Sequence, residues 1–188
     1  NGQDEEVLRT ELGKLLSQTN ARIRDQLGIQ NQNAVVLYIS QDEIDQTITA
    51  LHDAPQGSKL VRIVAAGNII LGEPAMVHFE LFDNKLVYHR EELVYEEHLQ
   101  AQDVSGSAEY QVFRFLHEVN QQAVKRGVLP DPLTGNIGSL TAAEMFDTIQ
   151  RIKASGNGDI ILRAVASTDI YTAGPLNIDI IVRSYAGQ

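Results

Sequence analysis

The chain has 188 residues, 43% of them hydrophobic and 21% charged, a composition that supports a folded core and excludes general disorder. Its 25 acidic residues against 15 basic ones give a net charge of −10, which argues against nucleic acid or an anionic lipid surface as a partner. The lack of cysteine excludes a disulfide framework, a thiolate zinc site and a cysteine nucleophile, and no run of 18 apolar residues is present.

The first half of the chain is predicted to contain two helices and several strands. Leucines and isoleucines recur at helical spacing over residues 5–27, and Gly28 ends this amphipathic helix. An unbroken apolar run at 34–39 predicts a buried strand, and Ser40 with Glu43 has the capping-box spacing that begins a second, shorter helix. The remaining strands of this half are predicted at 59–66, 75–82 and 85–89.

The second half begins with an irregular acidic stretch at 91–107, which we interpret as a linker or a surface excursion. A second long helix is predicted over 108–126 with Gly127 as its C-cap, followed by a loop rich in proline and glycine. Thr141 and Glu144 form another capping box at the start of a helix. The last strands are predicted at 159–166 and 176–184.

The two halves also resemble each other in sequence. A shift of 101 residues aligns 40–82 with 141–183 without a gap, and nine of the 43 pairs are identical, including Arg62 with Arg163. We therefore predict an internal duplication, although any unit of a helix and two strands produces similar caps and turns. The predicted fold class is α+β: duplicated αβαββ-like units about a pseudo-two-fold axis, with a mixed or antiparallel sheet and packed helices.

The duplication predicts how the chain is divided. A first repeat with the long N-terminal helix covers 1–90, the acidic linker covers 91–107, and a second repeat covers 108–188. Two copies of one unit pack most simply about a shared core, so both repeats are expected to form one compact domain.

Three segments of the second half resemble an uncharacterised bacterial family, the domain of unknown function 3084: residues 127–138, 161–166 and 169–175. Members of this family look like membrane-anchored proteins with N-terminal transmembrane segments, a long coiled coil and a C-terminal globular domain. The resemblance implies that this chain is the C-terminal domain, that it reaches the membrane only through a segment absent from this chain, and that it is a soluble domain on the extracytoplasmic side. The polar start at 1–6 suits such a fragment. The resemblance implies no catalytic residues.

Candidate metal ligands lie on two of the predicted strands. His78 and Glu80 are two residues apart and leave the same face of a strand, and His89 lies on the next strand. Imidazole and carboxylate groups are zinc ligands, but they also populate the solvated faces of hairpins. The repeat places Asp179 and Ile181 at the positions of His78 and Glu80, so we expect a solvated face and no metal.

The loop before the last predicted helix offers a candidate anion site. Thr134, Gly135, Asn136 and Ser139 precede a helix N-terminus, where free backbone amides attract negative charge. The loop has neither the lysine of a phosphate-binding loop nor the GxGxxG spacing. A rigid connection shaped by Pro130 and its neighbours is the favoured interpretation.

Arg62 and Arg163 occupy matching positions on equivalent predicted strands. They are candidates for binding a ligand, or for pairing with carboxylates or backbone carbonyls across the pseudo-axis, and we favour the structural role. Paired carboxylates and scattered serines do not form a catalytic constellation, so the sequence predicts no enzyme and no cofactor.

The sequence therefore favours a non-enzymatic assembly or interaction module at the end of a membrane-tethered coiled coil. We expect it to form a homo-oligomer and to bind a protein partner, because the N-terminal helix has an apolar face to bury. The alternative is a domain that binds a small molecule or anion at the interface of the two repeats, near 134–139 and the equivalent first-half surface.

Overall fold

The computed structural model describes residues 2–54, 57–68, 72–100, 107–131, 135–138, 140–155 and 158–185. The contacts divide the chain into two compact units, Asn1–Asp83 and Asn84–Gln188, which are described separately below. The helices and the mixed and antiparallel sheets confirm the predicted α+β class. In the described part of the chain, no helix has the length and apolarity that a membrane crossing requires.

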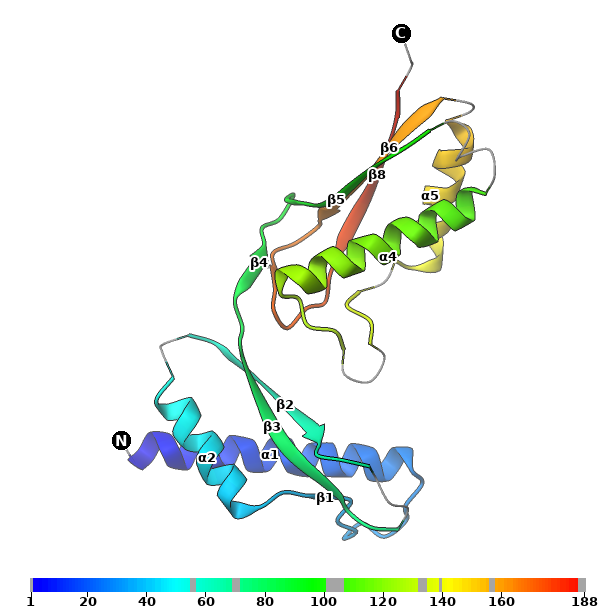
Figure 1. Cartoon of the computed structure of the whole chain (residues 1–188). Coiled ribbons are helices and arrows are strands. Elements are labelled where there is room, and N and C mark those ends of the chain that lie inside the picture. Colours follow the sequence, from blue (N-terminus) through cyan, green and yellow to red (C-terminus); the bar gives the residue numbers. More distant parts are fainter. Residues whose placement is uncertain are drawn as a thin grey trace. The chain divides into compact units, whose positions relative to one another are not determined.

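The first unit places two helices against a three-stranded sheet. Its elements are α1 (Gly2–Gln26), β1 (Leu37–Tyr38), α2 (Gln41–His52), β2 (Lys59–Ala65) and β3 (Ala75–Asp83). The strands lie in the order β1-β3-β2, with β2 and β3 antiparallel and β1 parallel to β3 (Figure 1).

The apolar stripe of α1 is used inside this unit. Leu12 is buried with Ile48 of α2 and Phe79 of β3, and further leucines of α1 pack around them. The predicted helix and its stripe are therefore confirmed. The stripe, however, completes the core of the first unit, so it is not the surface that a partner would need.

The second unit places two helices on one face of an antiparallel sheet. Its elements are β4 (Leu86–Tyr88), β5 (Leu93–Leu99), α4 (Ala108–Arg126), α5 (Ala142–Ala154), β6 (Asp159–Ala166), β7 (Ile170–Tyr171) and β8 (Ile178–Tyr185). The larger sheet has the order β5-β6-β8, and β4 pairs with β7 (Figure 1). The core includes Phe115 of α4, Ile152 of α5 and Leu162 of β6, each at 0% exposure.

The acidic stretch 91–107 is not simply a linker, because β5 lies inside it and pairs with β6. Arginines from other elements compensate its carboxylates: Glu92 pairs with Arg126 of α4, and Glu97 pairs with Arg114 of the same helix. The run of glutamates is thus compatible with a strand. The strand predicted at 85–89 is present as β4, and it pairs with β7, which lies far along the chain.

Two helices and a hairpin follow one another in the same order in both units, as α1, α2, β2 and β3 in the first and as α4, α5, β6 and β8 in the second, and the two hairpins share their strand register. The pair Leu60 with Phe82 in the β2–β3 hairpin corresponds, at a shift of 101 residues, to the pair Ile161 with Arg183 in the β6–β8 hairpin. The amide of Ala75 donates to the carbonyl of Val36 at 2.8 Å, and the equivalent amide of Leu176 donates to Ile137 at 2.6 Å. The duplication and its pseudo-two-fold axis stay predictions, which this shared register supports.

Candidate functional site

The predicted anion loop is only partly described. Thr134 and Ser139 lie outside the described residues. Gly135 has a φ of 70° and donates to the carbonyl of Asp131 at 2.8 Å, while the amide of Asp131 donates to the carbonyl of Asn136 at 2.7 Å. These backbone hydrogen bonds join Asp131 to Gly135 and Asn136 and agree with the predicted rigid connection. Anion binding stays a prediction.

The candidate metal ligands fall in both units. His78 and Glu80 lie on β3 with 3.8 Å between Nε2 and Oε1, whereas His89 belongs to the second unit and its amide donates to Glu92. Among the described residues, no group of three or more histidine or acidic side chains could hold a metal ion. A metal site therefore has no geometric support in the described structure.

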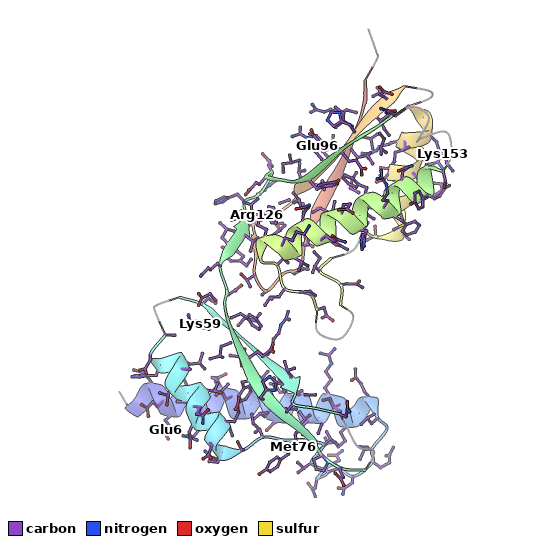
Figure 2. All side chains as sticks on the ribbon, in the orientation of Figure 1. Glu6, Lys59, Met76, Glu96, Arg126 and Lys153 are labelled. Atoms are coloured by element: carbon purple, nitrogen blue, oxygen red, sulfur yellow. The ribbon has the colours of Figure 1, made fainter. Side chains whose placement is uncertain are left out.

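Each of the two equivalent arginines contacts a residue of its own unit. The guanidinium of Arg62 lies 5.5 Å from the ring centre of Phe82, a cation–π contact on the β2–β3 hairpin. The Nε of Arg163 lies 2.8 Å from Oε2 of Glu96, an ion pair without the linear geometry of a hydrogen bond. Glu96 is labelled on β5 in Figure 2. Both contacts lie within a single unit, so pairing across the pseudo-axis and ligand binding by either arginine stay predictions.

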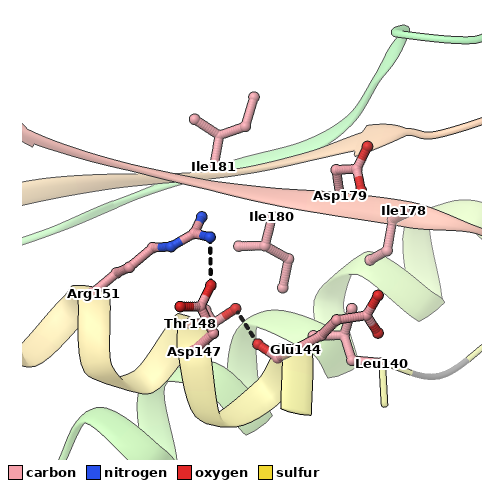
Figure 3. Close-up of a pocket in the computed structure, with 9 residues that line it drawn as sticks. All are labelled: Leu140, Glu144, Asp147, Thr148, Arg151, Ile178, Asp179, Ile180 and Ile181. Atoms are coloured by element: carbon pink, nitrogen blue, oxygen red, sulfur yellow. Dashed lines mark hydrogen bonds and ion pairs between the residues drawn. The ribbon is translucent and has the colours of Figure 1, made fainter. Parts of the chain in front are cut away.

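A groove between α5 and β8 is the candidate site that the structure adds, and it has a volume of about 310 Å³. Figure 3 shows Ile178 and Ile180 pointing from β8 toward α5, whereas Ile181 points to the other side of the strand. We call this site the β8 groove. Its lining consists of Leu140, Glu144, Asp147, Thr148, Arg151, Ile178, Asp179, Ile180 and Ile181.

The backbone of β8 forms one wall of this groove, because β8 is an edge strand of its sheet. The amide of Ser167 donates to the carbonyl of Asn177 at 3.0 Å, so this pair is hydrogen-bonded. In an antiparallel ladder such pairs alternate with pairs whose N–H and C=O groups point outward. The unbroken register of β6 with β8 therefore turns the backbone groups of Ile178, Ile180 and Val182 away from β6, toward the free edge.

The equivalent side of β3 in the first unit is covered: β1 pairs with β3 at Ala75 and Met76, and a side chain covers an outward amide further along the strand. Glu43 of α2 accepts a hydrogen bond from the outward amide of Phe79 at 3.1 Å. The corresponding residues of the second unit are Glu144 and Ile180. Glu144 turns instead to Thr141, accepting from its amide at 2.7 Å and from its hydroxyl at 2.8 Å. The outward amide of Ile180 therefore lacks the carboxylate partner that Phe79 has.

The groove combines an open backbone edge with apolar and charged side chains. The Thr141 amide and hydroxyl hold the pKa of Glu144 below its usual value, so its carboxylate is charged at neutral pH. Asp147 pairs with Arg151 one turn along α5, and Thr148 donates to the carbonyl of Glu144 at 2.8 Å. The lining contains no histidine, cysteine or serine, and its polar groups are three carboxylates, the Thr148 hydroxyl and the Arg151 guanidinium.

The β8 groove was missed by the sequence analysis. The alternation of β8 is visible in the sequence, but nothing in the sequence indicates whether another strand covers its outer edge. The capping box predicted at Thr141 and Glu144 is confirmed, whereas at Ser40 and Glu43 only the serine half of the predicted box is present. Only the structure shows that Glu43 reaches the neighbouring strand and that Glu144 does not.

The comparisons with known proteins agree with the resemblance found in the sequence. The family model described as the DUF3084-associated C-terminal helical hairpin matches residues 88–187, which include α4 and α5. No curated protein and no solved structure matches the chain. The match covers more than half of the sequence, so the chain belongs to the DUF3084 C-terminal domain family.

Proposed function

We propose that this chain is a non-enzymatic interaction module that binds an extended segment of a partner protein along β8. The observation that carries the proposal is the outer backbone edge of β8 at Ile178, Ile180 and Val182, with which no described strand pairs, beside the β8 groove. An edge strand presents donors and acceptors that a further strand can pair with, and several peptide-binding domains use this mode. Main-chain hydrogen bonds supply affinity without requiring one particular sequence.

The side chains of the groove select which segment fits. Leu140, Ile178 and Ile180 form an apolar floor for alternate side chains of an added strand. The three carboxylates Glu144, Asp147 and Asp179 outnumber the single guanidinium of Arg151. We therefore propose a partner segment that alternates apolar and basic residues.

We propose further that this module belongs to a larger protein. The resemblance implies a membrane anchor and a coiled coil ahead of this domain, on the extracytoplasmic side, and both belong to the proposal. A tethered module with an open strand edge would recruit a partner to the membrane. The binding of a small ligand at the interface of the two units has no comparable observation in its favour.

Selection of peptides by the whole chain tests the proposal. We expect a phage library of random 12-residue peptides to yield alternating, basic sequences that bind the chain and not its Val182→Pro variant. Proline removes the outward N–H of residue 182 and is tolerated where that group faces away from the sheet. Circular dichroism and the melting temperature establish that the variant is folded.

Two further results decide the proposal. Arg151→Glu, which adds negative charge to the groove, should tighten the binding of a selected basic peptide, whereas Lys153→Glu on the same helix should change it less. A library that yields no binder, or binders that tolerate Val182→Pro fully, would show that β8 is not the binding edge.

A further inference from the structure

An exposed stripe of side chains runs along α4 of the second unit. It consists of Tyr110, Phe113, His117, Gln121 and Val124, all of them exposed, and we call it the α4 stripe. Tyr110, Phe113 and Val124 are 63%, 57% and 43% exposed. The core-facing residues of the same helix, among them Phe115 and Val119, are 0% exposed, so the stripe lies on the side that the unit does not use.

The spacing of the α4 stripe is that of a helix-pairing seam. Its residues follow one another at steps of three, four, four and three, which keeps them on one face of the helix. Aromatic side chains are costly to expose and are enriched where protein surfaces meet. The stripe is therefore a candidate interface rather than an ordinary solvated face.

The charges beside the stripe indicate which partner fits. In an antiparallel pair of α4 helices centred on His117, Tyr110 lies opposite the partner's Val124, and Glu109 lies opposite the partner's Lys125. Opposite charges then meet at both ends, and the two helix dipoles oppose each other favourably. Within its own chain, Glu109 also forms an ion pair with Lys153 of α5, with 2.6 Å between Oε1 and Nζ.

We propose that the α4 stripe binds a second copy of this chain in an antiparallel arrangement, with the two-fold axis at His117. A surface that is complementary to itself gives the isologous contact of a two-fold dimer. A parallel pair would instead place Glu109 against the partner's Glu109 and Lys125 against the partner's Lys125. This inference goes beyond the β8 groove and does not depend on it.

The lack of cysteine allows a direct test of the register, because each single-cysteine variant carries only one thiol. A disulfide requires Cα atoms within about 7 Å of each other. In the proposed register residue 117 faces itself, whereas residues 110 of the two copies lie about 21 Å apart along the helix. His117→Cys should therefore cross-link to itself, and Tyr110→Cys should cross-link to Val124→Cys but not to itself.

The cross-linking rate is measured under mild oxidation of the whole chain at equal concentrations. The matched control is Tyr171→Cys on β7, where the native side chain is 44% exposed. We expect His117→Cys to form a dimer of twice the chain mass at least about tenfold faster than this control, because only the paired thiols are held within bonding distance. Adding Phe113→Glu to His117→Cys should lower its cross-linking rate to that of the Tyr171→Cys control.

Each other outcome overturns the proposal. Self-cross-linking of Tyr110→Cys as fast as that of His117→Cys would show a parallel pair. Equal rates for His117→Cys and Tyr171→Cys, with a monomeric mass by light scattering, would show that the stripe does not bind a second copy. Val182→Pro should leave the cross-linking rate of His117→Cys unchanged. The dimer proposal can therefore hold or fail independently of peptide binding at the β8 groove.

Discussion

At the scale of single residues, the end of α4 is attached to the β4–β5 corner by Arg126. Its guanidinium lies 4.2 Å from the ring centre of Tyr88 and also pairs with Glu92. Glu92 in turn accepts a hydrogen bond from the amide of His89 at 2.8 Å. This hydrogen bond and then the guanidinium lower the pKa of Glu92, while burial raises the pKa of Tyr88.

Glu92→Gln should destabilise the chain by about 1 kcal/mol at pH 7, because the amide replaces a charged acceptor. The folded pKa of Glu92 is lowered, so its contribution is present above the ordinary pKa of 4.5 and is lost as the pH falls through the folded pKa. Urea unfolding measures the free energy of unfolding of the native chain and of Glu92→Gln. The difference between the two should be smaller at acid pH than at pH 7. Glu91→Gln is the control, with its side chain 84% exposed, and an equal effect of both changes would contradict the prediction.

At the scale of elements, β3 and β8 differ in what lies beside their outward-facing backbone: β1 and the side chain of Glu43 lie beside β3, whereas β8 is an edge strand of its sheet. Glu43 covers the outward amide of Phe79, whereas Glu144 is held at its own helix cap. The second unit therefore has an open strand edge at β8, whereas the equivalent side of β3 in the first unit is covered. The two hairpins share their register, so the difference lies in what stands beside them: β1 and Glu43 in the first unit, and neither a described strand nor the Glu144 carboxylate in the second.

Hydrogen exchange of single amides measures this difference. In the free chain, the outward amides of Ile178 and Ile180 should exchange faster than the inward amides of Asp179 and Ile181. Glu43→Ala should accelerate exchange at Phe79. Glu144→Ala is the matched control and should leave Ile180 unchanged. An amide of Ile180 as protected as that of Asp179 would show that the edge is covered.

At the scale of the whole molecule, the two units have unequal cores. Among the described residues, the core cluster of the first unit contains three buried side chains, and that of the second unit contains 18. Burial of apolar area is the main favourable term in folding. The first unit should therefore be the less stable of the two.

Leu12→Ala should destabilise the first unit by roughly 2–4 kcal/mol, because it opens a cavity in a small core. Hydrogen exchange of the whole chain should then accelerate in β2 and β3 but not in β6. Val7→Ala is the control on the same helix, since Val7 is 60% exposed. Equal acceleration in β6 would show that both units unfold together.

The sequence by itself determined the helices and their ends. Thr141 caps α5 as predicted, and Gly127 ends α4 in the left-handed conformation, because caps depend on residues within one turn. The family was also recognisable from short motifs. These features are local, so they can be read without knowing what surrounds them.

The tertiary structure alone decided which strands meet and which edge stays open. β4 pairs with β7, more than 80 residues away, and β5 forms in an acidic stretch because arginines of α4 and β6 lie beside it. Glu43 and Glu144 follow identical cap spacings but bind different partners. Strand pairing and side-chain partners depend on groups far apart in the sequence, so only the folded chain brings them within the distance of a hydrogen bond.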